Sequence, residues 1–382
     1  MNPNNPHSTS ISVDTVDKVL CRIDFLIENC RLLAARRLYD KLLRLVDISK
    51  NCSDIESIRC KLDTRKSQLD QLVLRSDEIQ RIIGECSNNY DNWTLGSEMF
   101  GVRSYYRVEE DGLLCVRMEG IQDIPIFEQI AVFYECSLYK EWVPFCKQSD
   151  LLKKISHPEL VFHTAVSTPF MVRDMVLHAY ASDCMMEHGA IAFMGRSVEE
   201  FEGVKIPPHP NPFFGCRADV KMLCGVVSII SPSTAKTVII VKVNPRLALP
   251  QTIINFVMRQ MAGVFLYFMQ KQALRVASDP DCAHAMNVRA NSDFYKNFLL
   301  PNVRAYCQLR GWEQVTIPVL GNEGIAIPGK DYSRPDLYED TDCLLTDTAP
   351  NSEIHSFEKC TNTRENVSIE NNNAREAMSS EL

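Results

Sequence analysis

Two stretches near the N-terminus repeat apolar residues at spacings of three and four, which is the spacing along one face of an α-helix. They cover residues 13–45 and 55–83, and the polar break at 48–54 is rich in Asn, Ser and Asp. Those residue types favour turns and helix N-caps. The pattern predicts an α-helical hairpin or coiled-coil-like region over residues 12–86, preceded by a polar, disordered N-terminus over residues 1–11.

The apolar stripe of this region has two readings. Packed on itself, it makes a hairpin within one chain. Packed on a second copy, it makes a dimerising coiled coil. Residues 12–86 are therefore the expected place for self-association or a protein partner.

From Tyr90 the pattern changes to alternating strands. A hairpin is expected around the turn Glu109-Glu110-Asp111-Gly112. A helix follows it, over residues 124–139. Short connections between successive strands indicate an antiparallel sheet. The expected strands are 102–108, 113–118, 160–166, 175–183, 190–198, 218–230 and 237–243.

The segment after the last strand is the most apolar of the chain. From Thr252 to Gln270 its only charge is Arg259. A charged residue at the centre of a spanning helix costs about 3 kcal/mol on insertion scales. The pattern therefore predicts a buried or half-buried helix from Pro250 to about Val276, not a membrane span.

The rest of the chain divides in two. Residues 277–320 form an extension with an expected helix at 291–310, and residues 321–382 form an acidic tail expected to be disordered. The tail has 13 acidic and 5 basic residues, while residues 1–320 balance at 36 of each. The body is neutral, which excludes the basic footprint of a nucleic-acid binder.

The 15 cysteines form no CxxC pair, so neither a zinc ribbon nor a thioredoxin-like site is indicated. Their odd number and scattered positions fit a reducing compartment. The polar N-terminus lacks the apolar run of a signal peptide. We therefore expect a cytoplasmic protein, with no metal and no cofactor.

Four motifs in order resemble the START (steroidogenic acute regulatory protein-related lipid transfer) domain. The segment Tyr139-Lys140-Glu141-Trp142-Val143-Pro144-Phe145 looks like the family's tryptophan motif. Arg173-Asp174 resembles the pair that begins a central strand, and Arg217-Ala218-Asp219 resembles the start of a late strand. The segment from Leu249 to Phe256 looks like the opening of the last helix.

The resemblance covers residues 90–276. It implies an α+β helix-grip fold, in which a curved antiparallel sheet wraps around a C-terminal helix and leaves a lipid cavity between them. Here an α-helical hairpin precedes that domain. Some family members carry an arginine in the cavity six residues after the Arg-Asp arginine. That position is Ala179 here, so this polar anchor is absent.

Strand and helix periodicity then select candidate ligand contacts. In a strand, alternate residues share a face. One face of 175–183 is wholly apolar, and we assign the opposite set (Val176, His178, Tyr180 and Ser182) outward. One face of the last helix is likewise apolar. The candidates are Met175, Leu177, Ala179, Ala181, Ile253, Val257, Met261, Val264, Phe265 and Phe268.

In the family, the loop before the Arg-Asp strand flanks the cavity mouth. Phe170 and Met171 are therefore candidate gate or membrane contacts. The resemblance implies a protein that holds one lipid and exchanges it with membranes through a reversible surface contact. The lipid class stays open: phospholipid, sterol, ceramide and fatty acid all remain.

Two other functions compete with this one. A helix-grip enzyme acting on a hydrophobic ester or acyl substrate has no support from motifs, because GxSxG, HExxH, Walker A and GxGxxG are all absent. We therefore expect no catalytic residues. A lipid-sensing adaptor would use the hairpin and the tail to bind partners.

Overall fold

The computed structural model describes residues 11–49, 54–87, 89–168, 171–209, 216–246, 251–312 and 315–338. Of residues 168, 171, 251, 253, 254 and 256–262 it describes the backbone alone. All of these residues belong to one compact unit.

An antiparallel sheet of nine strands forms the centre of this unit, in the order β1-β2-β3-β9-β8-β7-β6-β5-β4. The expected α+β fold with a large antiparallel sheet is confirmed. The two strands that sequence alternation missed, β1 and β4, are the two edges of the sheet. The strands are β1 (Thr94–Met99), β2 (Val102–Val108), β3 (Leu114–Gln122), β4 (Cys146–Lys154), β5 (Glu159–Thr168), β6 (Met171–Cys184), β7 (Ala190–Ser197), β8 (Asp219–Ser231) and β9 (Thr234–Asn244).

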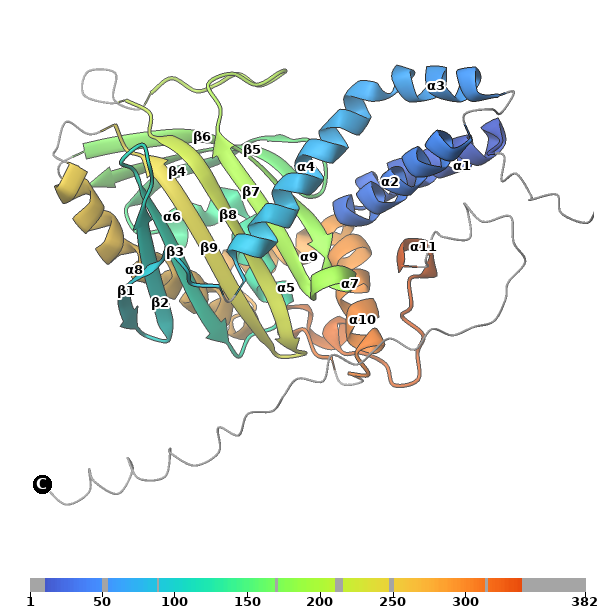
Figure 1. Cartoon of the computed structure of the whole chain (residues 1–382). Coiled ribbons are helices and arrows are strands. Elements are labelled where there is room, and N and C mark those ends of the chain that lie inside the picture. Colours follow the sequence, from blue (N-terminus) through green and yellow to red (C-terminus); the bar gives the residue numbers. More distant parts are fainter. Residues whose placement is uncertain are drawn as a thin grey trace, which may run out of the picture. The chain divides into compact units, whose positions relative to one another are not determined.

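Helices cover both faces of this sheet (Figure 1). The N-terminal helices are α1 (Val13–Glu28), α2 (Leu32–Ile48), α3 (Ile55–Thr64) and α4 (Lys66–Glu85). The helices that follow are α5 (Ile126–Tyr134), η1 (Cys136–Leu138), α6 (Tyr139–Trp142), α7 (Met185–His188), α8 (Gln251–Ser278), α9 (Ala283–Ala290), the π-helix η2 (Asp293–Leu299), α10 (Leu300–Leu309), η3 (Pro318–Gly324) and α11 (Pro335–Tyr338).

Alternation along the strands sorts side chains between these two layers. On β3, Val116 and Met118 pack with α5 and α8 in one core, while Cys115 packs in a second core with the N-terminal helices. We call the face on α5 and α8 the inner face and the face on α2 and α4 the outer face. Because both are covered, β3 is buried at nearly every position.

The N-terminal region has four helices where the periodicity predicted two. The first helix is interrupted at Cys30, whose φ is +63°. Arg31 N–H donates to Leu26 O and Cys30 N–H to Ile27 O, which is a Schellman motif that ends α1. This motif usually has glycine at the left-handed position, so the apolar spacing alone gave no sign of the break. The second helix bends at Arg65, between α3 and α4.

Helix α4 crosses the outer face over β7 and β8 (Figure 1). At the middle of this helix, Arg75 forms a two-pronged ion pair with Glu159 of β5, at 2.7 and 3.0 Å. At its C-terminal end, the fully buried Arg117 of β3 donates to the carbonyls of Glu85 (2.9 Å) and Ser87 (2.8 Å). A cation is favourable there, because the last carbonyls of a helix lack partners and carry partial negative charge.

The chain after α8 folds back along the inner layer. The expected helix at 291–310 corresponds to η2 and α10, and α9 precedes them. Residues 321–338 were expected in the disordered tail, but the structure shows them ordered, with Leu337 buried and η3 packed on α5 through Glu128. The prediction was made for residues 321–382 as a whole, but the part at 321–338 has only three acidic residues against two basic ones and is held by a few buried contacts. Residues 339–382 lie outside the described residues.

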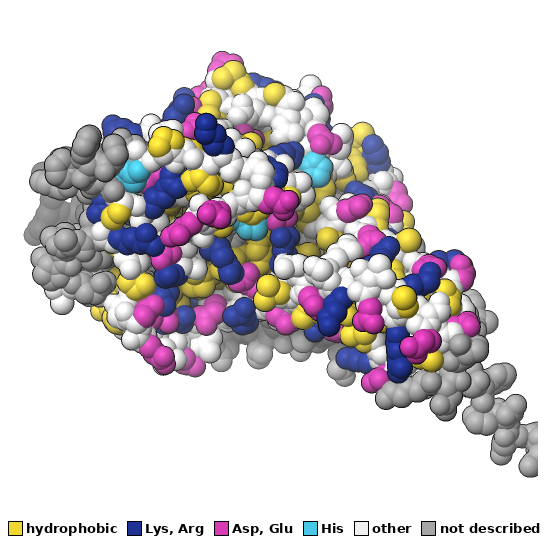
Figure 2. All heavy atoms as spheres, turned by 90° about the horizontal axis from the view of Figure 1, so that it is seen from above, with side chains coloured by type: hydrophobic (Ala, Val, Ile, Leu, Met, Phe, Trp, Pro, Cys, Tyr) yellow, Lys and Arg dark blue, Asp and Glu magenta, His cyan; other side chains and the backbone are white. Residues whose placement is uncertain are grey.

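Two surface properties bear on what the molecule contacts. In the part of the chain that the structure describes, no helix has the length and apolarity needed to cross a bilayer. Figure 2 shows basic and acidic side chains interleaved over the face seen from above. This mixture agrees with the neutral charge balance of residues 1–320.

Replacing Arg117 with methionine tests how α4 is held. Methionine keeps much of the side-chain volume but removes the donor to the last carbonyls of α4 and one of the donors to Glu119, which keeps its bond from the Tyr90 hydroxyl. We expect the free energy of unfolding, measured in urea, to fall by about 3 kcal/mol or more. Arg103→Met is the control, since Arg103 is 54% exposed in its pair with Glu98 and should cost under about 1 kcal/mol. Equal losses in both variants contradict this account.

Glu128 gives the fold a pH dependence of defined sign. Burial raises the pKa of its carboxyl from the ordinary value of 4.5 to about 7. Between these values the folded protein retains a proton that the unfolded chain has lost, so stability falls as pH rises. Glu128→Gln removes this loss, and its Oε1 still accepts from Val319 N–H. We expect the variant to match the parent at pH 4 and to exceed it by about 3 kcal/mol above pH 8.

The measurement is urea unfolding of both proteins at each pH. Other titrating groups are common to the two proteins and cancel in the difference. Glu56→Gln, at a position whose side chain is 90% exposed, is the control and should give no such difference. If the free energy of unfolding of Glu128→Gln follows that of the parent in parallel at every pH, Glu128 is not the source of this pH dependence.

Candidate functional site

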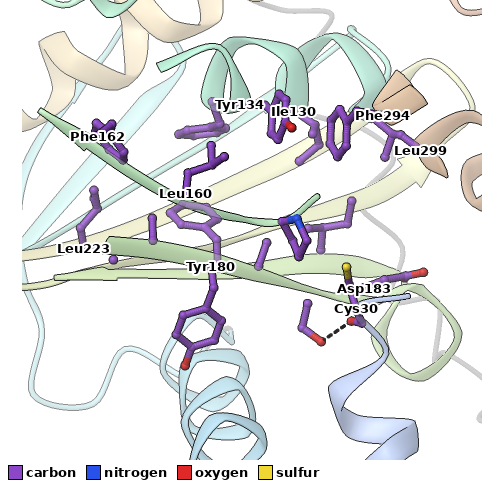
Figure 3. A pocket seen from close by; sticks show the side chains of 18 of the residues that line it. Cys30, Ile130, Tyr134, Leu160, Phe162, Tyr180, Asp183, Leu223, Phe294 and Leu299 are labelled. Atoms are coloured by element: carbon purple, nitrogen blue, oxygen red, sulfur yellow. Dashed lines mark hydrogen bonds between the residues drawn. The ribbon is translucent and has the colours of Figure 1, made fainter. Parts of the chain in front are cut away.

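A cavity of about 160 Å³ lies between the inner face of the sheet and the helices packed on it. Figure 3 shows Leu160 and Leu223 of the sheet below Ile130, Tyr134 and Phe294 of the helical layer. Tyr180, also labelled there, points away from the cavity toward a neighbouring helix. Its hydroxyl donates to Glu78 of α4.

The register in which β5, β6, β7 and β8 pair brings the residues of the sheet wall into one row. Leu160 of β5 pairs with Ala179 of β6, Ala179 with Gly195 of β7, and Gly195 with Leu223 of β8.

 All four residues line the cavity. Because Ala179, Ala181 and Gly195 are small, the centre of this wall leaves space that larger side chains would fill.

The opposite wall is mostly aromatic and comes from four elements, α5, α6, α8 and η2. The rings of Tyr134 (α5) and Phe294 (η2) stack with centroids 3.8 Å apart. Trp142, at the end of α6, lies 5.3 Å from Phe265 of α8. Phe298 and Leu299 of the π-helix complete this wall. Such helices occur often at functional sites.

The turn between α1 and α2 closes one end of the cavity (Figure 3). The Cys30 carbonyl accepts from the Ser182 hydroxyl and from the Asp183 backbone N–H, both at 2.9 Å. The neighbouring Arg31 is 2% exposed and donates to Glu187 at 3.0 Å and to the Leu337 carbonyl at 3.4 Å. The N-terminal helices, the sheet and the C-terminal segment therefore meet at this end.

The cavity wall has little charge. Among the described residues that line it, none is Lys, Arg or His, and Asp183 is the one carboxylate. Burial raises the pKa of Tyr139 and of the Cys30 thiol, the latter with a contribution from Asp183. Both groups are therefore neutral at physiological pH. No group of His, Cys, Asp and Glu in the described part of the chain is arranged to hold a metal ion.

The structure brings three of the ligand-contact candidates together at the cavity: Ala179, Ala181 and Phe265. Met175 and Leu177 pack farther along the inner face, against Phe162. Val264 is half-buried, and Phe268 is 36% exposed beside Tyr267, away from the cavity lining. The buried side of α8 is instead formed by Leu266, Met269, Ala273 and Val276.

The side chains of the remaining candidates lie outside the described part of the chain. Phe170 lies outside the described residues, and so do the side chains of Met171, Ile253, Val257 and Met261. They stay predictions. Of the set assigned outward on β6, Val176, Tyr180 and Ser182 are buried. Tyr180 contacts Glu78 of α4 and Ser182 contacts the α1–α2 turn, on the outer face.

Several cavity residues were not found from the sequence. Leu160, Phe162, Ile191 and Phe193 follow the alternation of their strands, so the argument used for β6 could have selected them. Cys30, Phe294 and Phe298 gave no such signal, because they come from segments outside the motif-bearing region.

Two of the family-like motifs meet at Asp174, which is fully buried. Its carboxylate lies 3.0 Å from Arg217 Nε and 3.0 Å from His163 Nε2. Its backbone carbonyl accepts from Ala218 N–H. Arg173 turns elsewhere and donates to the Pro245 carbonyl. The motifs therefore join β6 to the start of β8 and do not reach the cavity.

Comparison with solved structures gives several matches. Human STARD10 is 18% identical, with 59% of this chain and 87% of that chain covered and a TM-score of 0.48. Human StAR-related lipid transfer protein 5 is 19% identical, with 53% and 96% covered and a TM-score of 0.44. The Zhui aromatase/cyclase from Streptomyces sp. R1128 is 12% identical, with 44% and 97% covered and a TM-score of 0.32.

No family model matches the sequence, and no curated protein is detectably similar to it. The START-like fold predicted from the four motifs is nevertheless present, as a nine-stranded antiparallel sheet packed on α8. At these identities the comparison concerns the fold alone.

The contacts at the end of the cavity closed by the α1–α2 turn can be tested with two arginines that share Glu187 as a partner. Arg31 and Arg37 both contact Glu187, but Arg37 is 63% exposed. We expect Arg31→Met to lower the free energy of unfolding by about 3 kcal/mol, because it also removes the donor to Leu337. Arg37→Met should cost under about 1 kcal/mol. Urea unfolding measures both, and a larger loss for Arg37→Met contradicts the assigned contacts.

Proposed function

We propose that this protein binds a lipid in the cavity between the inner face of the sheet and helix α8. The apolar, aromatic lining of that cavity is the observation that carries the proposal. Each methylene moved from water into such surroundings contributes about 0.8 kcal/mol. The name of one similar structure, human StAR-related lipid transfer protein 5, agrees with this proposal.

The size of the cavity adds a condition. At about 160 Å³ it is close to an apolar cavity of about 150 Å³ that binds benzene. A ring or a short length of acyl chain fits without change, whereas pockets for larger ligands have about 300–1,000 Å³. A whole lipid therefore requires one wall to move outward. The proposal includes this movement, together with reversible contact between the protein and a membrane during exchange.

An enzyme on the same scaffold is less well supported by the chemistry of the lining. Cys30 is the one thiol among the described cavity residues, and burial raises its pKa, so the reactive thiolate is disfavoured. No histidine of the described lining stands beside it as a base. The aromatase/cyclase match has a fold of this kind, and its activity is a property of that protein.

The test begins with the protein purified from cells. Its bound lipids are extracted and identified by mass spectrometry, and the ratio of lipid to protein is measured. Ala181→Phe should lower that ratio at least about fivefold, because the added ring occupies the centre of the cavity, while urea unfolding should show a stable fold.

Ala290→Phe is the matched control, since it adds the same ring at an exposed position of α9. It should leave the lipid content unchanged. Transfer of the identified lipid between vesicles then separates a carrier, which accelerates transfer, from a protein that only retains its ligand. Parent protein without lipid, or equal lipid content in both variants, contradicts the proposed site.

A further inference from the structure

Two buried polar groups that line the cavity, the Trp142 indole N–H and the Tyr134 hydroxyl, make no hydrogen bond among the described residues. Of the two, the indole N–H can only donate, so an acceptor is the one partner that satisfies it. Trp142 is 6% exposed and lines the cavity, and its indole Nε1–H makes no hydrogen bond among the described residues. The nearby Tyr139 hydroxyl is different, because it donates to the Phe133 carbonyl at 2.7 Å. Buried donors are nearly always paired in folded proteins, and an unpaired one lowers stability.

The packing around Trp142 explains why the protein itself supplies no acceptor. Its ring lies against Tyr139 at 5.5 Å and Phe265 at 5.3 Å, in edge-on and tilted arrangements. Both neighbours present aromatic carbon to it. These aromatic neighbours offer no acceptor to the indole N–H. An oxygen atom of a ligand bound in the cavity would supply one.

The charge of the wall limits what that ligand can be. A phosphate or carboxylate in the cavity would find no Lys, Arg or His among the described lining residues. It would also share the cavity with the carboxylate of Asp183. Removing an anion from water without a counter-charge is unfavourable by several kcal/mol, and repulsion by Asp183 adds to this cost.

From the unpaired indole N–H and the cation-free wall, we infer that the cavity selects an uncharged lipid with an oxygen acceptor that bonds to Trp142. This inference rests on the proposed lipid binding and narrows it. Esters, ketones and alcohols of hydrophobic molecules have the required chemistry. Ionised fatty acids do not, and an anionic phosphate group must remain outside the described lining.

Three probes of similar length separate these properties: methyl dodecanoate, ionised dodecanoate and tridecane. Their binding to the full-length protein is measured at pH 8 by displacement of an apolar fluorescent dye. We expect the ester to bind at least tenfold more tightly than dodecanoate. Trp142→Phe should weaken ester binding about fivefold and leave tridecane binding nearly unchanged, since phenylalanine retains an apolar ring without the donor.

Tyr139→Phe is the matched control. It removes a polar atom from the same wall, but that atom is already bonded within the protein. It should change the affinities for the ester and for tridecane by the same factor. An ester-specific loss in Tyr139→Phe, or an equal loss for both probes in Trp142→Phe, overturns the role of the indole.

A second measurement does not depend on the Trp142→Phe fold. The chain has three tryptophans, so the indole N–H signal of Trp142 can be assigned in ¹⁵N NMR spectra by elimination with Trp93→Phe and Trp312→Phe. Methyl dodecanoate should shift it downfield, as expected for a new hydrogen bond, and tridecane should not. Equal shifts with both probes overturn the inference.

The outcomes also separate this inference from the proposal beneath it. If none of the probes binds and no lipid is found on the purified protein, lipid binding itself fails. If dodecanoate binds as tightly as the ester, lipid binding stands and the selection for an uncharged ligand is wrong.

Discussion

Neighbouring residues of β6 point to opposite faces of the sheet, and both faces are covered. Ala179 and Ala181 line the cavity on the inner face, while Tyr180 contacts Glu78 of α4 and Ser182 contacts the α1–α2 turn on the outer face. A shift of one residue in register would exchange these sets, placing the tyrosine ring in the cavity and alanine against α4. The position of α4 and the presence of a cavity therefore depend on the same register.

The contacts at the end of β6 connect the two layers further. Cys30 has a left-handed backbone conformation, which costs a residue other than glycine about 1–2 kcal/mol. In this conformation its carbonyl accepts from both Ser182 and Asp183, and these two bonds offset the cost. The N-terminal helices thus supply part of the cavity wall, and a change in cavity volume at this end has to displace the α1–α2 turn or its partners.

How much the sequence could predict differs between segments for physical reasons. The sheet and the inward position of Ala179 and Ala181 followed from a period of two, which leaves only two choices for each strand. The orientation of α8 was harder, because a helix that is apolar on most sides carries little information about which side is buried. Val264, Phe265 and Phe268 were all selected on that helix. Of these three, Phe265 alone lines the cavity. Edge strands β1 and β4 escaped notice because their exposed positions do not alternate.

The residues that no local pattern could supply are those that come from far along the chain. Phe294 and Phe298 reach the cavity from the C-terminal extension, and Phe294 stacks on Tyr134 of α5. Because the sheet wall is fixed by nine paired strands, a change in cavity size is more easily accommodated by the helical wall, where packing is between side chains. The π-helix η2 contributes three of the lining residues to that wall and ends beside the cavity. Expansion for a larger lipid is therefore expected at η2 and α8, not at the row formed by Leu160, Ala179, Gly195 and Leu223.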